Sequence, residues 1–120
     1  ARDAQFTGSL WVRGKSFDTF WPIGPFGVTA DSLPDHHVLD FQCRVNGVTL
    51  QDSNTRELIF KIPYLIAYIT PAITLMPGDI ILTGTPYGTG YFRDPQVLLK
   101  PGDVLETEIE GIGILINAVK

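Results

Sequence analysis

The stretch VLDFQCRVNGVTLQ, residues 38–51, decides the fold. Its apolar residues recur at every second position, a spacing that places them on one face of a β-strand: Leu39, Phe41, Cys43 and Val45. Asn46 and Gly47 follow at once, and because both residue types accept a positive φ they predict a tight hairpin turn. We therefore expect one strand over residues 38–45 and a return strand over residues 48–51.

A second pair of strands is predicted near the C-terminus. Residues 104–109 and 112–119 flank a turn at Glu110-Gly111. Upstream, the sequence Pro-Gly-Asp occurs twice before an apolar segment, at residues 77–79 and 101–103. Each copy predicts a turn that leads into a strand, because Pro presets φ and Gly accepts a positive φ. Two copies are too few for a repeat architecture, but they favour a β-rich, rolled body.

One helix is predicted, over residues 62–73. Pro63 suits its first turn, where the missing N–H is no loss, and apolar residues then follow helical spacing. Pro71 is expected to bend or end it. Residues 6–14 are expected to form a loop or a weak strand. Residues 15–27 contain two X-Pro pairs, which argue against a regular helix there.

Length and composition bound the function. The 120 residues make one domain, and 44% hydrophobic with 18% charged residues is typical of a folded globular protein. The net charge of −4 and the scattered Lys and Arg argue against a nucleic-acid partner. Cys43 is the single cysteine, so no disulfide forms within the chain; we expect it to pack as a small core residue in a reducing, cytoplasmic compartment. The longest apolar stretch is too short to span a membrane. Because Ala1 is not an initiator Met, we expect the chain to begin inside a longer gene product.

Two loops are candidate binding sites. The sequence LTGTPYGTG, residues 82–90, follows the apolar strand predicted over residues 80–82. Its short hydroxyls and backbone N–H groups suit a small anionic or carbonyl ligand, and the alternative is an ordinary Gly-rich turn. The sequence GKSFDT, residues 14–19, resembles a phosphate clamp only in part, because no helix follows it. A lone lysine in such a loop is usually a solvated surface charge, and the residues alone favour that interpretation of Lys15 over a phosphate clamp.

Other titratable residues give weaker signals. Adjacent residues of an extended chain point in different directions, so His36 and His37 make a poor metal site and are interpreted as surface residues. Glu106, Glu108 and Glu110 alternate as on a solvated strand face, with metal ligation as the alternative. No Ser-His-Asp arrangement and no zinc-type Cys/His spacing can be assembled. The residues by themselves therefore indicate a soluble β-rich domain with one candidate binding loop.

Eight segments, in order and covering essentially the whole chain, resemble the fumarylacetoacetate hydrolase family. They are ARDAQ (residues 1–5), GKSFDT (14–19), GP (24–25), VNG (45–47), QDSNT (51–55), MPGDIILTGTP (76–86), KPGDV (100–104) and EIEGIG (108–113). Each segment alone is weak, whereas the ordered set is specific.

The resemblance implies a mainly β (α+β) fold, a mixed β-roll or sandwich of the fumarylacetoacetase C-terminal-domain type with one short helix near residues 62–73. It also implies a homodimer and a bound Mg²⁺, Mn²⁺ or Ca²⁺. The implied substrates are small 2-oxo or 1,3-dicarbonyl acids, which family members cleave by hydrolysis, decarboxylate or isomerise. The metal chelates such an acid and stabilises the enolate that develops.

Site residues follow from the same resemblance. Lys15 matches a catalytic position beside the metal, where its ammonium favours a developing oxyanion, and Thr19 matches a position near the metal. The remaining matches are substrate-binding positions: Arg2, Gln5, Gly84 and Thr85.

The chain departs from the family pattern in its carboxylates. The resemblance implies metal-binding glutamates and an aspartate, with a water-activating His/Glu pair, all upstream of Ala1. Residues 1–120 are therefore expected to be a single domain portion that lacks its N-terminal half and binds metal poorly. Two functions stay open: part of a metal-dependent hydrolase or lyase, or a catalytically inactive fragment that serves for binding or dimerisation.

Overall fold

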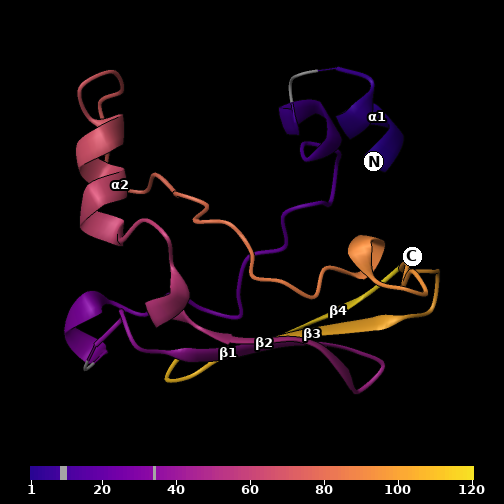
Figure 1. The fold of residues 1–120 in the computed structure, drawn as a ribbon. Helices are drawn as coiled ribbons and strands as arrows, with labels where there is room; N and C mark the ends of the chain where they lie inside the picture. The colour runs from indigo at the N-terminus through magenta and orange to yellow at the C-terminus, as the bar shows by residue number, and fades with distance from the viewer. Residues whose placement is uncertain (9–10, 34) are drawn as a thin grey trace.

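The chain folds around one four-stranded antiparallel sheet (Figure 1). The structure, a computed structural model, describes residues 1–8, 11–33 and 35–120, without the side chain of Arg2. The strands are β1 (Asp40–Val45), β2 (Val48–Asn54), β3 (Val104–Ile109) and β4 (Gly113–Ala118), in the order β2-β1-β3-β4. The predicted fold class, mainly β with few helices, is confirmed.

The predicted hairpin is confirmed and carries one irregularity. Asn46 and Gly47 take φ values of 51° and 77° and join β1 to β2. Cys43 pairs with Gln51 but Arg44 pairs with Thr49, so Leu50 is an extra residue in β2. Such a β-bulge leaves one residue outside the regular ladder and changes the direction of its neighbours.

The hairpin turn is also fastened to the start of β3. The backbone N–H of Asn46 donates to the carbonyl of Val104 at 2.9 Å, and the N–H of Val104 donates back to Asn46 Oδ1 at 2.9 Å. The side-chain amide of Asn46 donates to Asp103 Oδ1 at 2.9 Å, and the N–H of Lys100 donates to Asp103 Oδ2 at 2.8 Å. The Asn46 side chain therefore joins the β1–β2 turn to the start of β3.

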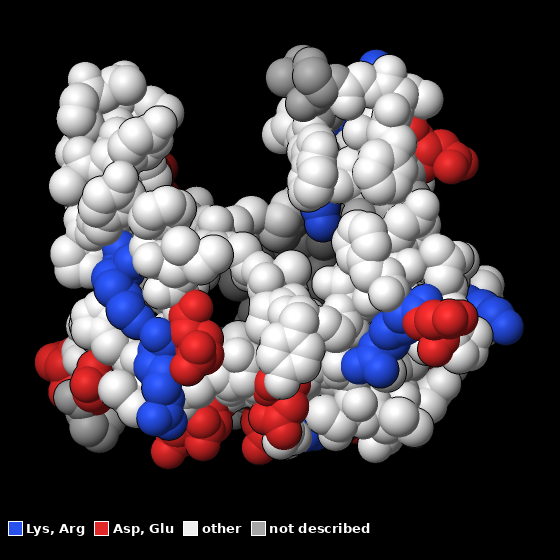
Figure 2. Space-filling view, viewed as in Figure 1, with Lys and Arg blue, Asp and Glu red and all other residues white. Residues whose placement is uncertain are grey.

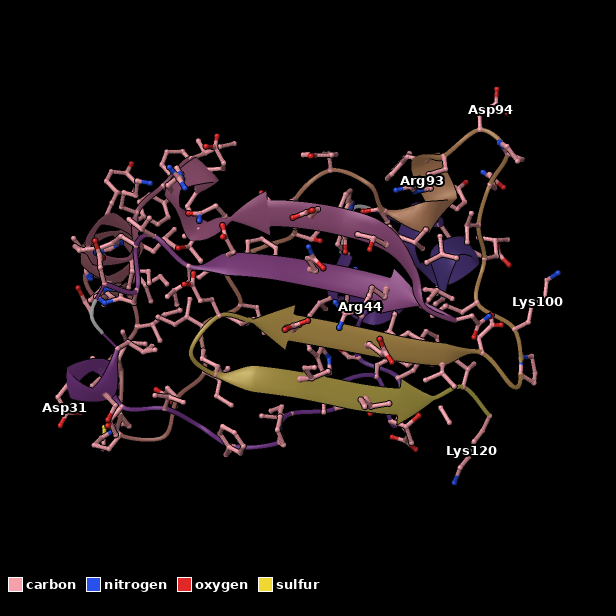
Figure 3. All side chains as sticks on the ribbon, turned by 90° about the horizontal axis from the view of Figure 1, so that it is seen from below. Asp31, Arg44, Arg93, Asp94, Lys100 and Lys120 are labelled. Atoms are coloured by element: carbon pink, nitrogen blue, oxygen red, sulfur yellow. The ribbon has the colours of Figure 1, made fainter. Side chains whose placement is uncertain are left out.

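One face of the sheet is open and polar. Figure 3 shows this face, with the molecule viewed from below. Arg44 lies at its centre and forms ion pairs with Glu106 at 2.9 Å and Glu108 at 2.8 Å. Its side chain is 17% exposed. The third glutamate of the predicted solvated face, Glu110, accepts a hydrogen bond from the N–H of Asp40 through Oε2. All three carboxylates therefore already bind a neighbouring group on the sheet.

Two arms rise from the opposite face (Figure 1). One holds α1 (Arg2–Phe6) and the 3-10 helix η1 (Trp11–Gly14), and the other is α2 (Ile62–Ile69). The prediction of a loop or weak strand over residues 6–14 is wrong for the described residues of this range. Local hydrogen bonds, such as that from the Thr7 N–H to the carbonyl of Asp3, form helical turns there instead. Helix α2 begins as predicted but ends at Ile69, two residues before Pro71.

Three shorter 3-10 helices lie in the connections: η2 (Ala30–Ser32), η3 (Thr55–Glu57) and η4 (Gly90–Phe92). The strand predicted over residues 80–82 is absent. Ile80 and Leu82 are exposed in a connection that pairs with no strand of the described chain. Residues extend into a ladder only where a neighbouring strand accepts their hydrogen bonds.

The core is small. Among the described residues, the buried apolar side chains are Leu39 and Val45, each 8% exposed. By contrast Ile59, Tyr68 and many other large apolar residues are exposed. Figure 2 shows a largely uncharged surface around the hollow between the two arms. No helix formed by the described residues is long and apolar enough to cross a bilayer.

Candidate functional site

A cavity of about 590 Å³ lies beside the sheet, near the foot of α2. Its floor comes from β1 and β2, one wall from the connection between η3 and α2, and the other from the loop of residues 82–90. The lining residues are Phe41, Ser53, Asn54, Thr55, Glu57, Leu58, Ile59, Phe60, Thr83, Gly84, Thr85, Pro86 and Tyr87. The cavity therefore includes the predicted substrate-binding residues Gly84 and Thr85.

Gln51 of β2 holds the loop by its side-chain amide. Its Nε2 lies 2.9 Å from Thr85 Oγ1, 3.1 Å from the carbonyl oxygen of Pro86 and 3.2 Å from that of Tyr87. Gln51 pairs with Cys43 across the hairpin, which places its side chain on the cavity face of the sheet together with Phe41. The position of Thr85 is thus set by a strand residue.

The same loop is fastened to β2 on both sides of Gln51. The hydroxyl of Tyr87 donates to the carbonyl of Asp52 at 3.1 Å. The guanidinium of Arg93 donates to the carbonyls of Gly88, at 3.0 Å, and Leu50. Leu50 is the bulge residue, and its carbonyl lies so close to Gly88 that a Cβ at that position would overlap it. Gly88 also has a φ of 92°, so both the contact and the backbone require glycine.

Polar groups at the cavity divide into those already bonded and those open to a ligand. Asn54 donates to Asp40 Oδ1 and accepts from the N–H of Arg56, and the Thr55 hydroxyl donates to the carbonyl of His36. Thr85 Oγ1 accepts from Gln51 but donates its own proton to no acceptor in the described chain. Its hydroxyl is therefore available as a donor.

Three other predicted site residues belong to the N-terminal arm. Gln5 is 2% exposed and packs against Gly14, where an added Cβ would lie 2.6 Å from Gln5 Cβ. Lys15 follows Gly14 directly, is exposed, and donates its backbone N–H to the carbonyl of Val12 at 3.0 Å. Thr19 has a φ of 68°, a sparsely populated conformation for a β-branched residue. Such backbone conformations concentrate at functional sites.

The two groups are separate clusters within the described residues. The lining of the cavity includes Thr85 but not Gln5, Lys15 or Thr19. The rings of Phe6 and Tyr91, 5.9 Å apart, bring α1 beside η4, which begins at Gly90, the last residue of the loop of residues 82–90. The side chain of Arg2 lies outside the described part of the chain.

The described chain does not assemble a metal site. Within residues 1–8, 11–33 and 35–120, no three His, Cys, Asp or Glu side chains are grouped so as to hold an ion. His36 and His37 lie with ring centroids 4.1 Å apart, both half-buried, and the N–H of His37 donates to Asp35 Oδ1 as in a turn. Burial raises the pKa of the Cys43 thiol, which fits a packing role and disfavours the thiolate.

Sequence reasoning missed Gln51 and Arg93. Gln51 lies in one of the segments that carry the family resemblance, but its role depends on a loop thirty-four residues away. Arg93 follows the glycine-rich loop and has no spacing that indicates a partner. The usable signal was Gln51 itself, a long polar side chain on the inward, apolar face of a predicted strand.

Comparison with known proteins identifies relatives of the chain. A sequence model described as fumarylacetoacetate (FAA) hydrolase, C-terminal, matches residues 1–120. The mitochondrial oxaloacetate tautomerase Fahd2a of Rattus norvegicus is 52% identical over 120 residues, which are 99% of this chain and 38% of that protein. The chain thus spans well under half the length of this relative.

Two solved structures are similar in shape as well as sequence. A fumarylacetoacetate hydrolase from Exiguobacterium antarcticum has a TM-score of 0.95 at 41% identity, over 100% of this chain and 43% of that one. A maleylpyruvate hydrolase from Sphingobium sp. SYK-6, solved in complex with manganese (II) ion and pyruvate, has a TM-score of 0.80 at 40% identity. That match covers 92% of this chain and 39% of the hydrolase.

Proposed function

Because this chain belongs to the fumarylacetoacetate hydrolase family, we propose that it supplies substrate-binding groups for an enzyme acting on a small 2-oxo or 1,3-dicarbonyl acid. The observation that carries the proposal is the cavity of about 590 Å³ that Gly84 and Thr85 line. A cavity of this size accommodates a small dicarboxylic acid. The names of the tautomerase and the maleylpyruvate hydrolase support this substrate class.

Each proposed residue has a chemical role. The Thr85 hydroxyl donates a hydrogen bond to a carboxylate or carbonyl oxygen, and Gly84 leaves the space for it, since nothing lies within 4 Å of a Cβ built there. Arg2 and Gln5 bind the acid's carboxylate or carbonyl. Lys15 favours negative charge that develops on the substrate oxygen, and Thr19 lies near the metal.

The proposed reaction of the complete enzyme is C–C bond cleavage through an enolate. A divalent ion, Mg²⁺ or else Mn²⁺ or Ca²⁺, supplies chelation of the acid in such chemistry. The manganese ion in the maleylpyruvate hydrolase structure supports this choice of cofactor. The described residues of this chain do not form a metal site, and the role proposed for them is to bind and orient the acid. Decarboxylation and isomerisation are alternatives with the same binding groups.

A second candidate function is an inactive binding or dimerisation module. It is favoured by the exposed apolar side chains of the α2 arm, such as Tyr64, Ile66 and Tyr68. Large exposed apolar patches usually mark interaction surfaces. A homodimer is proposed on either function. No nucleic acid or membrane partner is proposed.

The cellular compartment is also a proposal. The sequence predicts the cytoplasm from its single cysteine, whereas the name of the rat relative assigns that protein to mitochondria. Both compartments keep thiols reduced, so the half-buried, unpaired Cys43 is compatible with either.

The proposed function is tested by binding and turnover together. Pyruvate binding is followed by the ¹H–¹⁵N spectrum of the chain, and oxaloacetate or an acylpyruvate is then supplied to the complete gene product with Mg²⁺ or with a chelator. We expect pyruvate to shift the amide signals of residues 83–85 and 87, and the complete protein to consume one of these substrates only with the metal.

Each other outcome assigns the protein differently. Pyruvate binding without turnover by the complete protein would favour a binding module. A stable dimer with neither binding nor turnover would favour a dimerisation module and refute the enzymatic proposal.

A further inference from the structure

We propose that Gln51 is a positioning residue that fixes the hydroxyl of Thr85 as a hydrogen-bond donor toward the cavity. This inference rests on the proposed function, because it assigns the Thr85 donor to an anionic or carbonyl oxygen of the substrate. It concerns a residue to which the sequence assigned no role.

The contacts of Gln51 determine which end of its amide faces the loop. Two of its three partners are the carbonyl oxygens of Pro86 and Tyr87, which only accept hydrogen bonds. An amide oxygen at the same place would meet two carbonyl oxygens without a proton between them. The nitrogen therefore faces the loop, and it is also the donor to Thr85 Oγ1 at 2.9 Å.

This direction decides what the threonine can do. A hydroxyl has one proton and two lone pairs, and Gln51 occupies one lone pair. The proton cannot point back at Gln51, because the amide hydrogens are there. Within the described chain no acceptor receives it, so it is directed to the cavity that Thr85 lines. A donor at this place favours a ligand oxygen carrying full or partial negative charge.

The scaffold keeps this arrangement in place. Gln51 lies between Leu50 and Asp52, whose carbonyls accept from Arg93 and Tyr87 respectively. The loop is thus attached to β2 at three consecutive residues, and the β-bulge at Leu50 lies beside the residue that orients Thr85. Hydrogen bonds from helices and strands fix the position of a binding group more precisely than contacts within a loop do.

The ligand class follows from polarity. The open donor at Thr85 and the glycine beside it suit the carboxylate or keto oxygen of a 2-oxo acid, not a cation or an amine. Among the described residues that line the cavity, Glu57 on the opposite wall carries the only carboxylate. An acid that binds Thr85 through a carboxylate has that carboxylate on the wall opposite Glu57.

The test reverses the polarity of residue 51. In Gln51→Glu the ionised carboxylate accepts from Thr85, which turns the hydroxyl proton away from the cavity, and it also faces the carbonyl oxygens of Pro86 and Tyr87 without a proton between them. The protonated carboxyl donates again. In Gln51→Met no polar contact is left at any pH. Dissociation constants for pyruvate are measured by ¹H–¹⁵N spectra at about pH 7 and about pH 4.5 for the native protein and both variants, with the dispersion of the spectra as the check on folding.

We expect both variants to bind pyruvate about tenfold more weakly than the native protein at pH 7, the effect of roughly one hydrogen bond. At pH 4.5, near the usual glutamate pKa of about 4.3, Gln51→Glu regains much of its affinity relative to the native protein and Gln51→Met does not. A loss that is the same at both pH values in both folded variants would mean that Gln51 is only structural, which overturns the inference. Native affinity of Gln51→Glu at pH 7 overturns it as well.

A second readout separates this inference from the proposed function. The side-chain amide protons of Gln51 are observed without any ligand, and we expect Thr85→Val to shift the proton that points to Thr85. An unchanged Gln51 amide in Thr85→Val refutes the contact and with it the inference. If the native protein fails to bind pyruvate while the amide shifts as expected, the donor toward the cavity stands and the 2-oxo acid assignment is refuted.

Discussion

The side-chain amide of Asn46 donates a hydrogen bond of 2.9 Å to the carboxylate of Asp103, across the boundary between the β1–β2 hairpin and β3. Hydrogen bonding by Asn46, followed by that of the Lys100 N–H, lowers the pKa of Asp103 below its ordinary value of 3.8. The folded state therefore binds a proton less readily than the unfolded state. The stabilisation by Asp103 is complete above its ordinary pKa and is lost as the pH falls through the lowered one.

The first prediction concerns this pH dependence. Asp103→Asn removes the carboxylate whose charged form is stabilised by folding. Between about pH 6 and pH 3 the free energy of unfolding should therefore fall less in this variant than in the native protein. Urea unfolding midpoints at the two pH values measure it. Asp79→Asn is the matched control, since Asp79 follows the same Pro-Gly pair and accepts the N–H of Met76 at 2.7 Å. An equal pH response in Asp103→Asn and the native protein would contradict the assignment.

The second prediction concerns Gly88. In Gly88→Ala the new Cβ overlaps the carbonyl of Leu50, and the φ of 92° is unfavourable as well, so we expect the loop to detach from β2. Gly78→Ala is the matched control, because Gly78 has a φ of 99° but open space around it. The free energy of unfolding should fall by roughly 1–2 kcal/mol in the control, which is the cost of a left-handed conformation for a non-glycine residue. It should fall by more in Gly88→Ala.

Hydrogen exchange distinguishes the two glycine variants. Amides of residues 85, 87, 88 and 50–52 should exchange faster in Gly88→Ala and at the native rate in Gly78→Ala, since only the first variant separates the loop from the strand. Equal exchange in the two variants would show that the contact with Leu50 does not hold the loop.

The third prediction concerns the open face of the sheet. Arg44→Met leaves Glu106 and Glu108 side by side on one face without their shared cation, so we expect a lower free energy of unfolding. The difference from the native protein should shrink in about 1 M salt, where the screening length is about 3 Å. Arg13→Met, in η1, serves as the control for loss of one positive charge. A salt-independent difference would attribute the effect to packing alone.

The fourth prediction concerns Lys15. In the complete gene product, Lys15→Ala should lower kcat about a hundredfold or more with folding retained, because an electrostatic contribution to an oxyanion is lost. Lys120→Ala is the matched control, since this lysine is at the opposite end of the chain and has no proposed role. Turnover at the native rate in Lys15→Ala would remove this residue from the mechanism.

Local patterns predicted the parts of the fold that depend on neighbours in sequence. The Asn46-Gly47 turn, the β3–β4 turn and the start of α2 at Ile62 depend on residues only a few positions apart. The length of β2 and its bulge at Leu50 depend instead on β1 and on Arg93. No local rule contains that information.

The candidate site shows the same division. Gly84 and Thr85 line the cavity. The glycine- and threonine-rich sequence indicated a candidate binding loop over residues 82–90, and the family resemblance singled out these two residues within it. Gln51 could not be assigned a role in this way, because its three contacts are made by residues 85–87. The roles of Lys15 and Thr19 stay predictions from family resemblance, and the backbone φ of Thr19 is a structural reason to test them.

A sheet that buries little more than Leu39 and Val45 has a calorimetric consequence. The heat-capacity increment of unfolding grows with the apolar area that becomes hydrated, and many large apolar side chains of this chain are already exposed in the folded state. Its unfolding should therefore show a small increment per residue and a shallow temperature dependence of the enthalpy. A binding partner that covers the α2 arm would raise the heat-capacity increment in proportion to the apolar area that it removes from water.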